Sequence, residues 1–333
     1  MRTGWLTEAT RVISAVAKRL ARTLFMIFAV SVLTFIMTDM APGKYLEEIK
    51  LNPQISPNTL AALRAEYGLD RPLAVRYLFW LSSAARGEFG FSFAYNCPVW
   101  PLLRVRAENS LILTVTAMLL SWALAIPIGI LAATHAGRWQ DRASAVSTTF
   151  LLATPDVLVG LALLAFALHT RWFPTGGMHT LTNEMELFPR AQDFARHLFL
   201  PAAALTAGML PTLIRHVRSS MLDVLNSPFI AAARGHGIPA GRILLRHVLP
   251  AAANPLISLL GVSVGTLLSG SLLIEVIMSW PGVGPLLLQA VLERDVYIVI
   301  AAIMFSTLFL ITGNLTADAL LYMADPRIRT DQP

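Results

Sequence analysis

Residues 109–137 read NSLILTVTAMLLSWALAIPIGILAATHAG and contain no Asp, Glu, Lys or Arg. About 20 mostly apolar residues are enough for a helix to cross the roughly 30 Å hydrocarbon core of a membrane. We therefore predict a membrane-spanning helix near Leu111–Ala133. Pro127 within it is no objection, because neighbouring helices in a membrane protein can satisfy the backbone groups that a proline leaves free.

The composition of the whole chain agrees with a membrane protein. Of its 333 residues, 55% are hydrophobic and only 14% are charged, and the mean hydropathy is +0.61. A soluble domain carries about 25% charged residues, so the composition excludes an ordinary soluble enzyme, and also a disordered or collagen-like chain. The net charge of +6 indicates a membrane surface rather than nucleic acid, because the basic residues are scattered through loops between apolar runs. The single cysteine, Cys97, excludes an intramolecular disulfide and a cysteine-based zinc site.

Apolar windows like the first recur along the chain. The window nearest the N-terminus, residues 23–38, could instead be the apolar core of a secretory signal. It slightly exceeds the usual length of about 7–15 residues, however, and no small-residue cleavage site clearly follows. We predict an all-α polytopic membrane protein with six transmembrane helices. The six windows are residues 23–38, 109–137, 143–170, 197–214, 247–274 and 296–317, the last continuing to about Tyr322.

The distribution of basic residues predicts the orientation of these helices. Short cytoplasmic loops of membrane proteins carry an excess of Lys and Arg. With both termini in the cytoplasm, the inside segments hold 14 of the 26 Lys and Arg in fewer residues than the outside segments. The predicted parts are a cytoplasmic amphipathic N-terminal segment (1–22), the first transmembrane helix (23–40), an extracytoplasmic loop (41–107), a five-helix core (108–322) and a cytoplasmic tail (323–333).

Two of the polar segments are predicted to contain helices. In the long extracytoplasmic loop, helix start and stop signals predict short helices from Ser56 to Gly68 and from Pro72 to before Gly87. These helices could cap the bundle or meet a soluble partner, and the sequence does not separate the two. Residues 1–22 place apolar and charged side chains at helical spacing, which is typical of a helix lying in the membrane interface.

The inside loop at 215–250 has the most distinctive sequence, with FIAAARGHGIPAGRILLRHVLP at residues 229–250. It predicts a short helix over Pro228–Arg234, a turn at Gly235 and Gly237, and a second amphipathic stretch over Ala240–Val248. Small side chains on the first helix would let another protein approach its backbone closely; they are Ala231, Ala232 and Ala233. On physical grounds alone, a docking element and a re-entrant surface loop are both open.

The same loop resembles a known motif. The run AAARGHG, followed nine residues later by His247-Val248-Leu249-Pro250, is similar to the EAA loop of ATP-binding-cassette (ABC) importer permeases. Gly237 matches the glycine of that motif. Ala231 stands where many members have Glu, although the dipeptide-type branch often lacks that acid too.

Further segments resemble the dipeptide, oligopeptide and nickel branch of these permeases, in the same order along the chain. Glu88 departs from the pattern, because the branch usually has Asp there. The similar segments are MAPG (40–43), YGLDRPLAVRYLFWL (67–81), GEFGFSF (87–93), PVWPLL (98–103), IPIGILAA (126–133), IEVIMSWPGVG (274–284) and YMADPRIR (322–329).

The resemblance implies a type I ABC importer permease in the bacterial inner membrane. Its implied partners are a homologous second permease, two cytosolic ATP-binding subunits and an extracytoplasmic solute-binding protein. We expect no cofactor on this chain and no catalytic residue, with ATP used by the partner subunits. The absence of a G-x-x-x-x-G-K-[ST] phosphate loop agrees with this. Nothing selects one substrate among dipeptides, oligopeptides, nickel chelates and other peptide-like solutes. The residues expected to couple to the ATPases are Ala231, Ala232, Ala233, Gly237, His247 and Pro250.

Two acids are candidates for the substrate path. Asp156, expected near the middle of the third helix, would cost roughly 2.5–3.5 kcal/mol to insert, and such residues usually face a cavity. A cationic substrate group or a neighbouring helix could be its partner. Glu275 matches a family acid before the SWPG turn, where it could orient the turn or contact substrate. The seven histidines show no paired ligand spacing, so we assign no metal.

Two other functional classes remain as alternatives. An ion-coupled secondary transporter commonly has inverted repeats and midplane ion sites, but we detect no internal repeat and the EAA-like loop would go unexplained. An intramembrane enzyme would need a nucleophile elbow, a carboxylate dyad or paired metal ligands, and none appears within the apolar windows.

Overall fold

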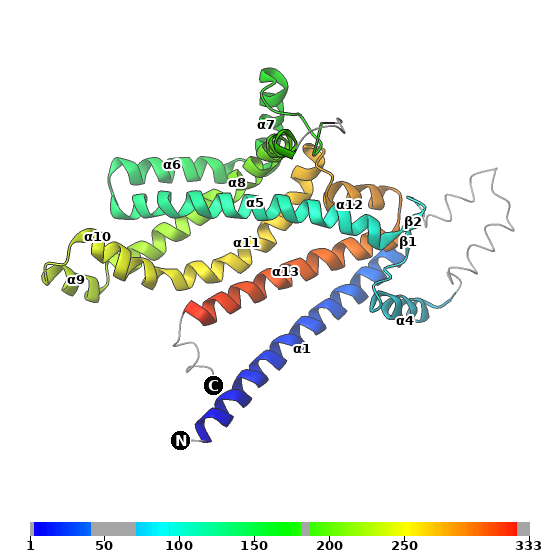
Figure 1. Cartoon of the computed structure of the whole chain (residues 1–333), viewed down its shortest axis with the longest axis horizontal. Coiled ribbons are helices and arrows are strands. Elements are labelled where there is room, and N and C mark those ends of the chain that lie inside the picture. Colours follow the sequence, from blue (N-terminus) through cyan, green and yellow to red (C-terminus); the bar gives the residue numbers. More distant parts are fainter. Residues whose placement is uncertain (1–2, 41–70, 93, 181–186, 325–333) are drawn as a thin grey trace. The chain divides into compact units, whose positions relative to one another are not determined.

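The computed structural model describes residues 3–40, 71–92, 94–180 and 187–324 of the chain. These residues are almost entirely helical (Figure 1). Besides the helices there is one short antiparallel hairpin, in which Phe91 pairs with Pro98 and Ser92 with Cys97. The elements are α1 (Thr3–Met40), α4 (Leu73–Ala84), β1 (Phe91–Ser92), β2 (Cys97–Pro98), α5 (Val99–Thr134), α6 (Trp139–Ala153), α7 (Asp156–Thr170), α8 (Leu187–Leu225), α9 (Pro228–Gly235), α10 (Ala240–Ile243), the π-helix η1 (Leu244–Val248), α11 (Leu249–Ile277), α12 (Val283–Leu292) and α13 (Val296–Ala324).

Several helices are long and apolar enough to cross a membrane. By length and composition, the described residues contain five such helices, or six when the bent pair α6–α7 counts as one span. The five lie within α1, α5, α8, α10–α11 and α13. The prediction of a polytopic all-α protein is confirmed, and the chain is a multi-pass membrane protein.

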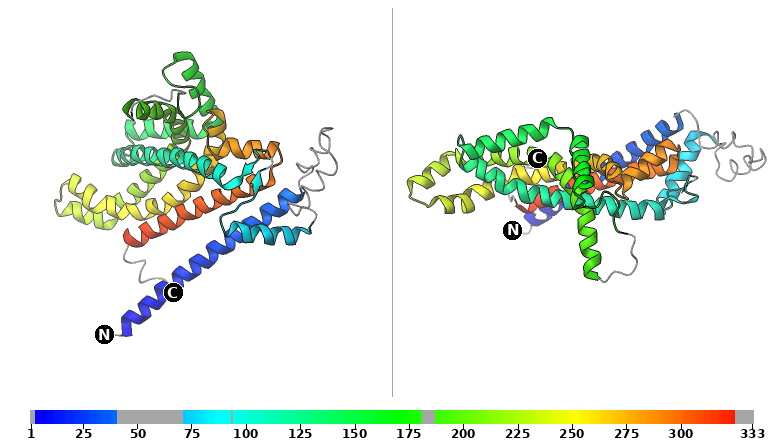
Figure 2. Two further views of the ribbon diagram at one scale, coloured as in Figure 1. Left: turned by 45° about the vertical axis from the view of Figure 1, so that its right-hand side comes forward. Right: turned by 90° about the horizontal axis from the view of Figure 1, so that it is seen from above.

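The third predicted window does not form a single helix, so the expectation of Asp156 at mid-helix was wrong. The chain bends by 96° between α6 and α7, as Figure 2 shows. Thr154 is extended at φ −96° and ψ 118°, because a residue before proline is disfavoured in the helical region. Helix α7 then begins at Asp156, directly after Pro155.

The chain forms two compact units. The first combines Met1–Val105 with Leu286–Ile311. In it, Phe35 of α1, Trp80 of α4 and Ile300 of α13 form a buried cluster. Helix α4 confirms the short helix predicted between Pro72 and Gly87. The other predicted short helix, from Ser56 to Gly68, lies outside the described residues, and α1 runs through both the predicted N-terminal segment and the first span.

The hairpin is fixed by one buried carboxylate. Asp295, which directly precedes α13, accepts a hydrogen bond from the Ser92 hydroxyl at 2.7 Å and one from the Ala94 N–H at 3.3 Å. Its other oxygen caps the helix by accepting the Ile298 N–H at 3.4 Å. A hairpin too short to be stable alone is thereby anchored to the start of α13.

The second unit combines Arg106–Pro285 with Thr312–Pro333 and holds the larger core. Helices α5, α8 and α11 contribute Leu113, Leu213 and Leu267 to one buried cluster, which also includes Trp280. Helices α5 and α8 approach closely where a Cβ atom on Gly129 would lie 2.6 Å from Val217 Cγ1. Small residues at such crossings are typical of helix packing in membranes.

Candidate functional site

The segment between α8 and α11 folds into an element attached by apolar side chains. Helix α9 is followed by a turn and by α10, and both lie at one end of α8 and α11 (Figure 1). Ile230, Ile243 and Val248 of this segment are at most 3% exposed and pack with Val217 and Met221 of α8. We call residues Pro228–Pro250 the coupling element. Its buried side holds it against the second unit.

The opposite side of the coupling element presents small residues. Ala231 and Ala232 are exposed, whereas Ala233 is half-buried and packs against the same buried cluster as Ile230 and Ile243. The docking element and the surface loop were both open from the sequence. The structure shows a folded helix–turn–helix in which two of the three alanines are exposed.

A left-handed glycine ends α9. Gly237 has φ +72°, a conformation that glycine adopts without steric cost. The Gly237 N–H donates to the Arg234 carbonyl at 2.9 Å, and the Ile238 N–H donates to the Ala233 carbonyl at 3.3 Å. This pattern is a Schellman motif, which satisfies carbonyls at a helix C-terminus. A Cβ atom on Gly237 would meet nothing within 4 Å, so backbone conformation rather than crowding favours glycine here.

The second half of the coupling element continues into α11. The π-helical turn η1 comes directly before α11, and the Leu249 N–H donates to the Leu244 carbonyl. Pro250 lies in the first turn of α11, where it is exposed, and His247 lies on the π-turn, half-buried. The second predicted helix therefore has no end at Pro250. π-Turns inside helices occur frequently at functional sites.

Asp156 lies against two glycines of neighbouring helices. A Cβ atom on Gly208 of α8 would lie 2.5 Å from Asp156 Oδ1, and one on Gly270 of α11 would lie 3.9 Å from Oδ2. Gly208 thus leaves room for the carboxylate beside the bend between α6 and α7, whereas a Cβ atom on Gly270 would make only an ordinary contact with it. Asp156 is exposed in the single chain, so its carboxylate is accessible at a break in a helix.

Glu275 is enclosed by the turn that follows α11. It is fully buried, and its Oε2 accepts the Gly284 N–H at 2.7 Å. A side chain on Gly282 would overlap this carboxylate. Among the residues that the structure describes, the other oxygen, Oε1, has no hydrogen-bond partner. This is the geometry of a turn-orienting contact.

The same turn is also fixed to α5. The Val283 N–H donates to the Ser110 hydroxyl at 2.8 Å, and the Trp280 indole donates to the Asn109 carbonyl at 3.0 Å. The Asn109 amide in turn donates to the Pro281 carbonyl at 2.7 Å. Asn109 and Ser110 were not among the predicted site residues, because no local pattern links them to residues about 170 positions later.

Sequence reasoning also missed an ion pair at the start of α6. Arg218 of α8 contacts Asp141 with one edge of its guanidinium, Nε to Oδ1 at 2.5 Å and Nη2 to Oδ2 at 2.8 Å. Asp141 Oδ2 also accepts the Gly137 N–H at 2.9 Å. Arg218 lies in the predicted inside loop at 215–250 and Asp141 lies between the windows 109–137 and 143–170, but their separation in sequence carries no pairing signal.

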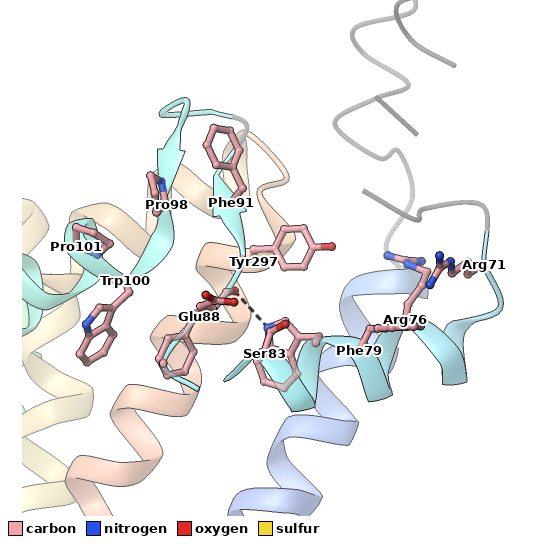
Figure 3. A pocket seen from close by; sticks show the side chains of 14 residues that line it. Arg71, Arg76, Phe79, Ser83, Glu88, Phe91, Pro98, Trp100, Pro101 and Tyr297 are labelled. Atoms are coloured by element: carbon pink, nitrogen blue, oxygen red, sulfur yellow. Dashed lines mark hydrogen bonds between the residues drawn. The ribbon is translucent and has the colours of Figure 1, made fainter. Parts of the chain in front are cut away.

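The first unit holds a cavity of about 670 Å³ between α4, the hairpin and the starts of α5 and α13 (Figure 3). Arg71 and Arg76 lie at one side of it and Trp100 at the other, as the figure shows. The Arg71 guanidinium stacks over the Phe79 ring, 4.7 Å from its centre. The cavity is thus aromatic with charged groups on its lining.

These features define a polytopic helical membrane protein with a folded, accessible element between two of its spans. The sequence profile of binding-protein-dependent transport system inner membrane components matches residues 125–330, and the profile of their N-terminal part matches residues 12–117. The chain belongs to this family. The resemblance to peptide-type ABC importer permeases is therefore confirmed.

Individual relatives cover nearly the whole chain. The oligopeptide transport system permease protein AppB of Bacillus subtilis (strain 168) is 33% identical over 315 residues, covering 94% of this chain and 98% of that protein. The glutathione transport system permease protein GsiC of Escherichia coli (strain K12) is 31% identical, with coverage of 94% and 98%. The solved inward-facing structure of the MetNI methionine ABC transporter matches with a TM-score of 0.54 at 16% identity, covering 67% of this chain and 96% of that one. At this identity the likeness concerns the fold.

Proposed function

We propose that this chain is the permease subunit of a bacterial inner-membrane ABC importer for peptides or peptide-like solutes. It forms the translocation path together with a homologous second permease. Two cytosolic ATP-binding subunits supply the ATP chemistry, so this chain carries no catalytic residue and binds no cofactor. A solute-binding protein delivers substrate from the other side, and both termini are cytoplasmic. Family membership and the peptide permeases among the relatives support this proposal.

The coupling element is the observation that carries the proposal. Its apolar side is anchored in the second unit while Ala231 and Ala232 are exposed. A partner that pushes on α9 therefore moves the attached ends of α8 and α11 with it. Ala231–Ala233 would fit the cleft of an ATP-binding subunit, and Gly237 would fix the turn. His247 on the π-turn and Pro250 in the first turn of α11 would support the junction between the two.

The translocation path includes Asp156 in this proposal. The carboxylate is accessible beside a helix break, where it could bind a cationic group such as a peptide amine. For Glu275, the enclosed geometry supports orientation of the turn rather than substrate contact.

Reconstitution tests the proposal against an ion-coupled transporter. The chain is purified with its co-expressed permease and ATP-binding subunits and placed in proteoliposomes with the solute-binding protein. Uptake of labelled di- and oligopeptides and of glutathione is then measured. We expect uptake to require both ATP and the solute-binding protein. ATP must be present on the side of the membrane that carries the ATP-binding subunits, and the solute-binding protein on the opposite side. Uptake driven by an ion gradient without ATP would contradict the proposal.

A further inference from the structure

The contact between Arg218 and Asp141 is a bidentate ion pair within the second unit. Two parallel N–H to carboxylate bonds fix the relative orientation of the two groups more tightly than a single contact does. The Asp141 side chain is 9% exposed and the Arg218 side chain 36%. Asp141 also accepts the Gly137 N–H, so its carboxylate joins α8 both to the α5–α6 turn and to the first turn of α6.

Helix α6 packs along α8 but buries few of its own side chains. Along α6, which the structure describes in full, Asp141 and Thr148 are the buried residues. The Thr148 hydroxyl bonds back to the Ser144 carbonyl of its own helix. The large apolar side chains Val146 and Phe150 are 70% and 71% exposed. Asp141 is therefore the side chain through which α6 makes a specific bond to α8.

Arg218 belongs to the part of α8 that carries the coupling element. Its neighbour Val217 and the residue one turn later, Met221, are buried against Ile230 and Ile243 of that element. A displacement of α9 therefore reaches this segment of α8 through tightly packed side chains, which transmit rather than absorb small movements.

We propose that Arg218 and Asp141 are positioning residues that pass the movement of the coupling element to α6. From α6 the movement continues to the bend before Asp156. This inference rests on the proposed function, because it assigns a route to the coupling of ATP hydrolysis and transport. The apolar packing moves α8, and the ion pair obliges α6 to follow.

The test compares uptake with ATP hydrolysis in the same proteoliposomes of the complete complex. The variants are Arg218→Gln, Asp141→Asn and the milder Arg218→Lys, which keeps the charge but not the planar fork. The matched control is Arg215→Gln, an exposed arginine one turn earlier on α8. Co-purification of the ATP-binding subunits reports assembly for each variant.

We expect Arg218→Gln and Asp141→Asn to raise the ATP hydrolysed per solute imported roughly tenfold, within the range of about 5–150-fold that is typical of coupling between sites. Arg218→Lys should give a smaller rise and Arg215→Gln none. The double variant Arg218→Gln/Asp141→Asn should be no worse than either single one, because both remove the same contact.

Three results would overturn the inference. One is an unchanged ratio of ATP hydrolysed to solute imported in variants that assemble. Another is an equal fall of uptake and ATP hydrolysis, which would indicate that the ion pair is a structural contact only. The third is loss of assembly in all three variants, including Arg218→Lys. A wild-type complex without ATP-dependent uptake would instead reject the proposed function itself, so the two failures are distinguishable.

Discussion

Glu275 Oε2 accepts the backbone N–H of Gly284 at 2.7 Å, so a side chain near the end of α11 fixes the first turn of α12. Ser110 of α5 does the same for the adjacent Val283 N–H. The SWPGVG segment is thus held by side chains from two helices. Glycine at 282 and 284 is the condition for this arrangement, because Cβ atoms there would meet the Glu275 carboxylate.

Replacing Glu275 with leucine should destabilise the protein. The variant leaves the buried Gly284 N–H without an acceptor, which costs about 1–3 kcal/mol. Glu275→Gln keeps an acceptor oxygen and should cost much less. Thermal unfolding of the purified permease in detergent measures both. Equal unfolding temperatures for the Leu and Gln variants would mean that the hydrogen bond to Gly284 does not support the turn.

Substitutions at Gly237 should separate backbone conformation from charge. Asn tolerates the left-handed region better than Ala does, so Gly237→Asn should retain most uptake. Gly237→Asp has nearly the same shape but adds a charge on the accessible side of the coupling element. We expect it to abolish uptake and permease-stimulated ATP hydrolysis while membrane insertion stays normal. Normal uptake by the Asp variant would contradict the docking role of this turn.

Asp156→Asn should impair substrates that carry a free amino terminus. Loss of a charged hydrogen bond corresponds to about 1.5–3 kcal/mol, so uptake of such peptides at low concentration should fall about tenfold or more. N-acetylated peptides that the complex also imports serve as the control and should change little. If uptake of every substrate is unaffected, Asp156 has no place in the path.

Gly208→Ala offers an independent test of the same carboxylate. A Cβ atom at this position would lie 2.5 Å from Asp156 Oδ1, so the side chain of Asp156 must move. The uptake profile should resemble that of Asp156→Asn, although no charge is removed. A normal profile would show that the position of the carboxylate against α8 is unimportant for transport.

Ile230→Ala should loosen the coupling element. The side chain is fully buried, and truncation of a buried isoleucine costs about 2–5 kcal/mol. Leu245, in the same element, is 68% exposed and provides the control, because Leu245→Ala should alter stability little. Limited proteolysis between Arg234 and Arg246 measures the local loosening. Equal cleavage of both variants would contradict the anchoring role of Ile230.

The sequence predicts the spans and α9 well because their signals are local. Long charge-free windows and the glycines after Arg234 are read directly from neighbouring residues. The bend at Pro155 between α6 and α7 was not predicted, because a proline in an apolar window does not by itself indicate a break. Other prolines in such windows lie inside continuous helices: Pro127, Pro201, Pro211 and Pro255. A proline alone does not distinguish a tolerated position from a break; the surrounding packing decides.

The polar contacts of the second unit were not predictable in the same way. Glu275 and Asp156 are conspicuous as isolated acids in apolar windows. Gly284 lies in the SWPGVG motif, but nothing in that motif shows that its N–H donates to Glu275, and Gly208 lies in no motif. The ion pair of Asp141 and Arg218 was even less predictable from the sequence. Both residues look like ordinary loop charges until the packing of α6 on α8 brings them together.

The coupling element separates its two tasks between different residues. Ile230, Ile243 and Val248 are buried and secure it to the permease, while Ala231 and Ala232 are exposed, where the proposed ATP-binding subunit would meet them. Changes on the exposed side therefore leave the anchoring core intact. Under the proposed function, subunit recognition can therefore change at these exposed positions without loss of folding. They are the positions to alter when a permease is to accept the ATP-binding subunits of another importer.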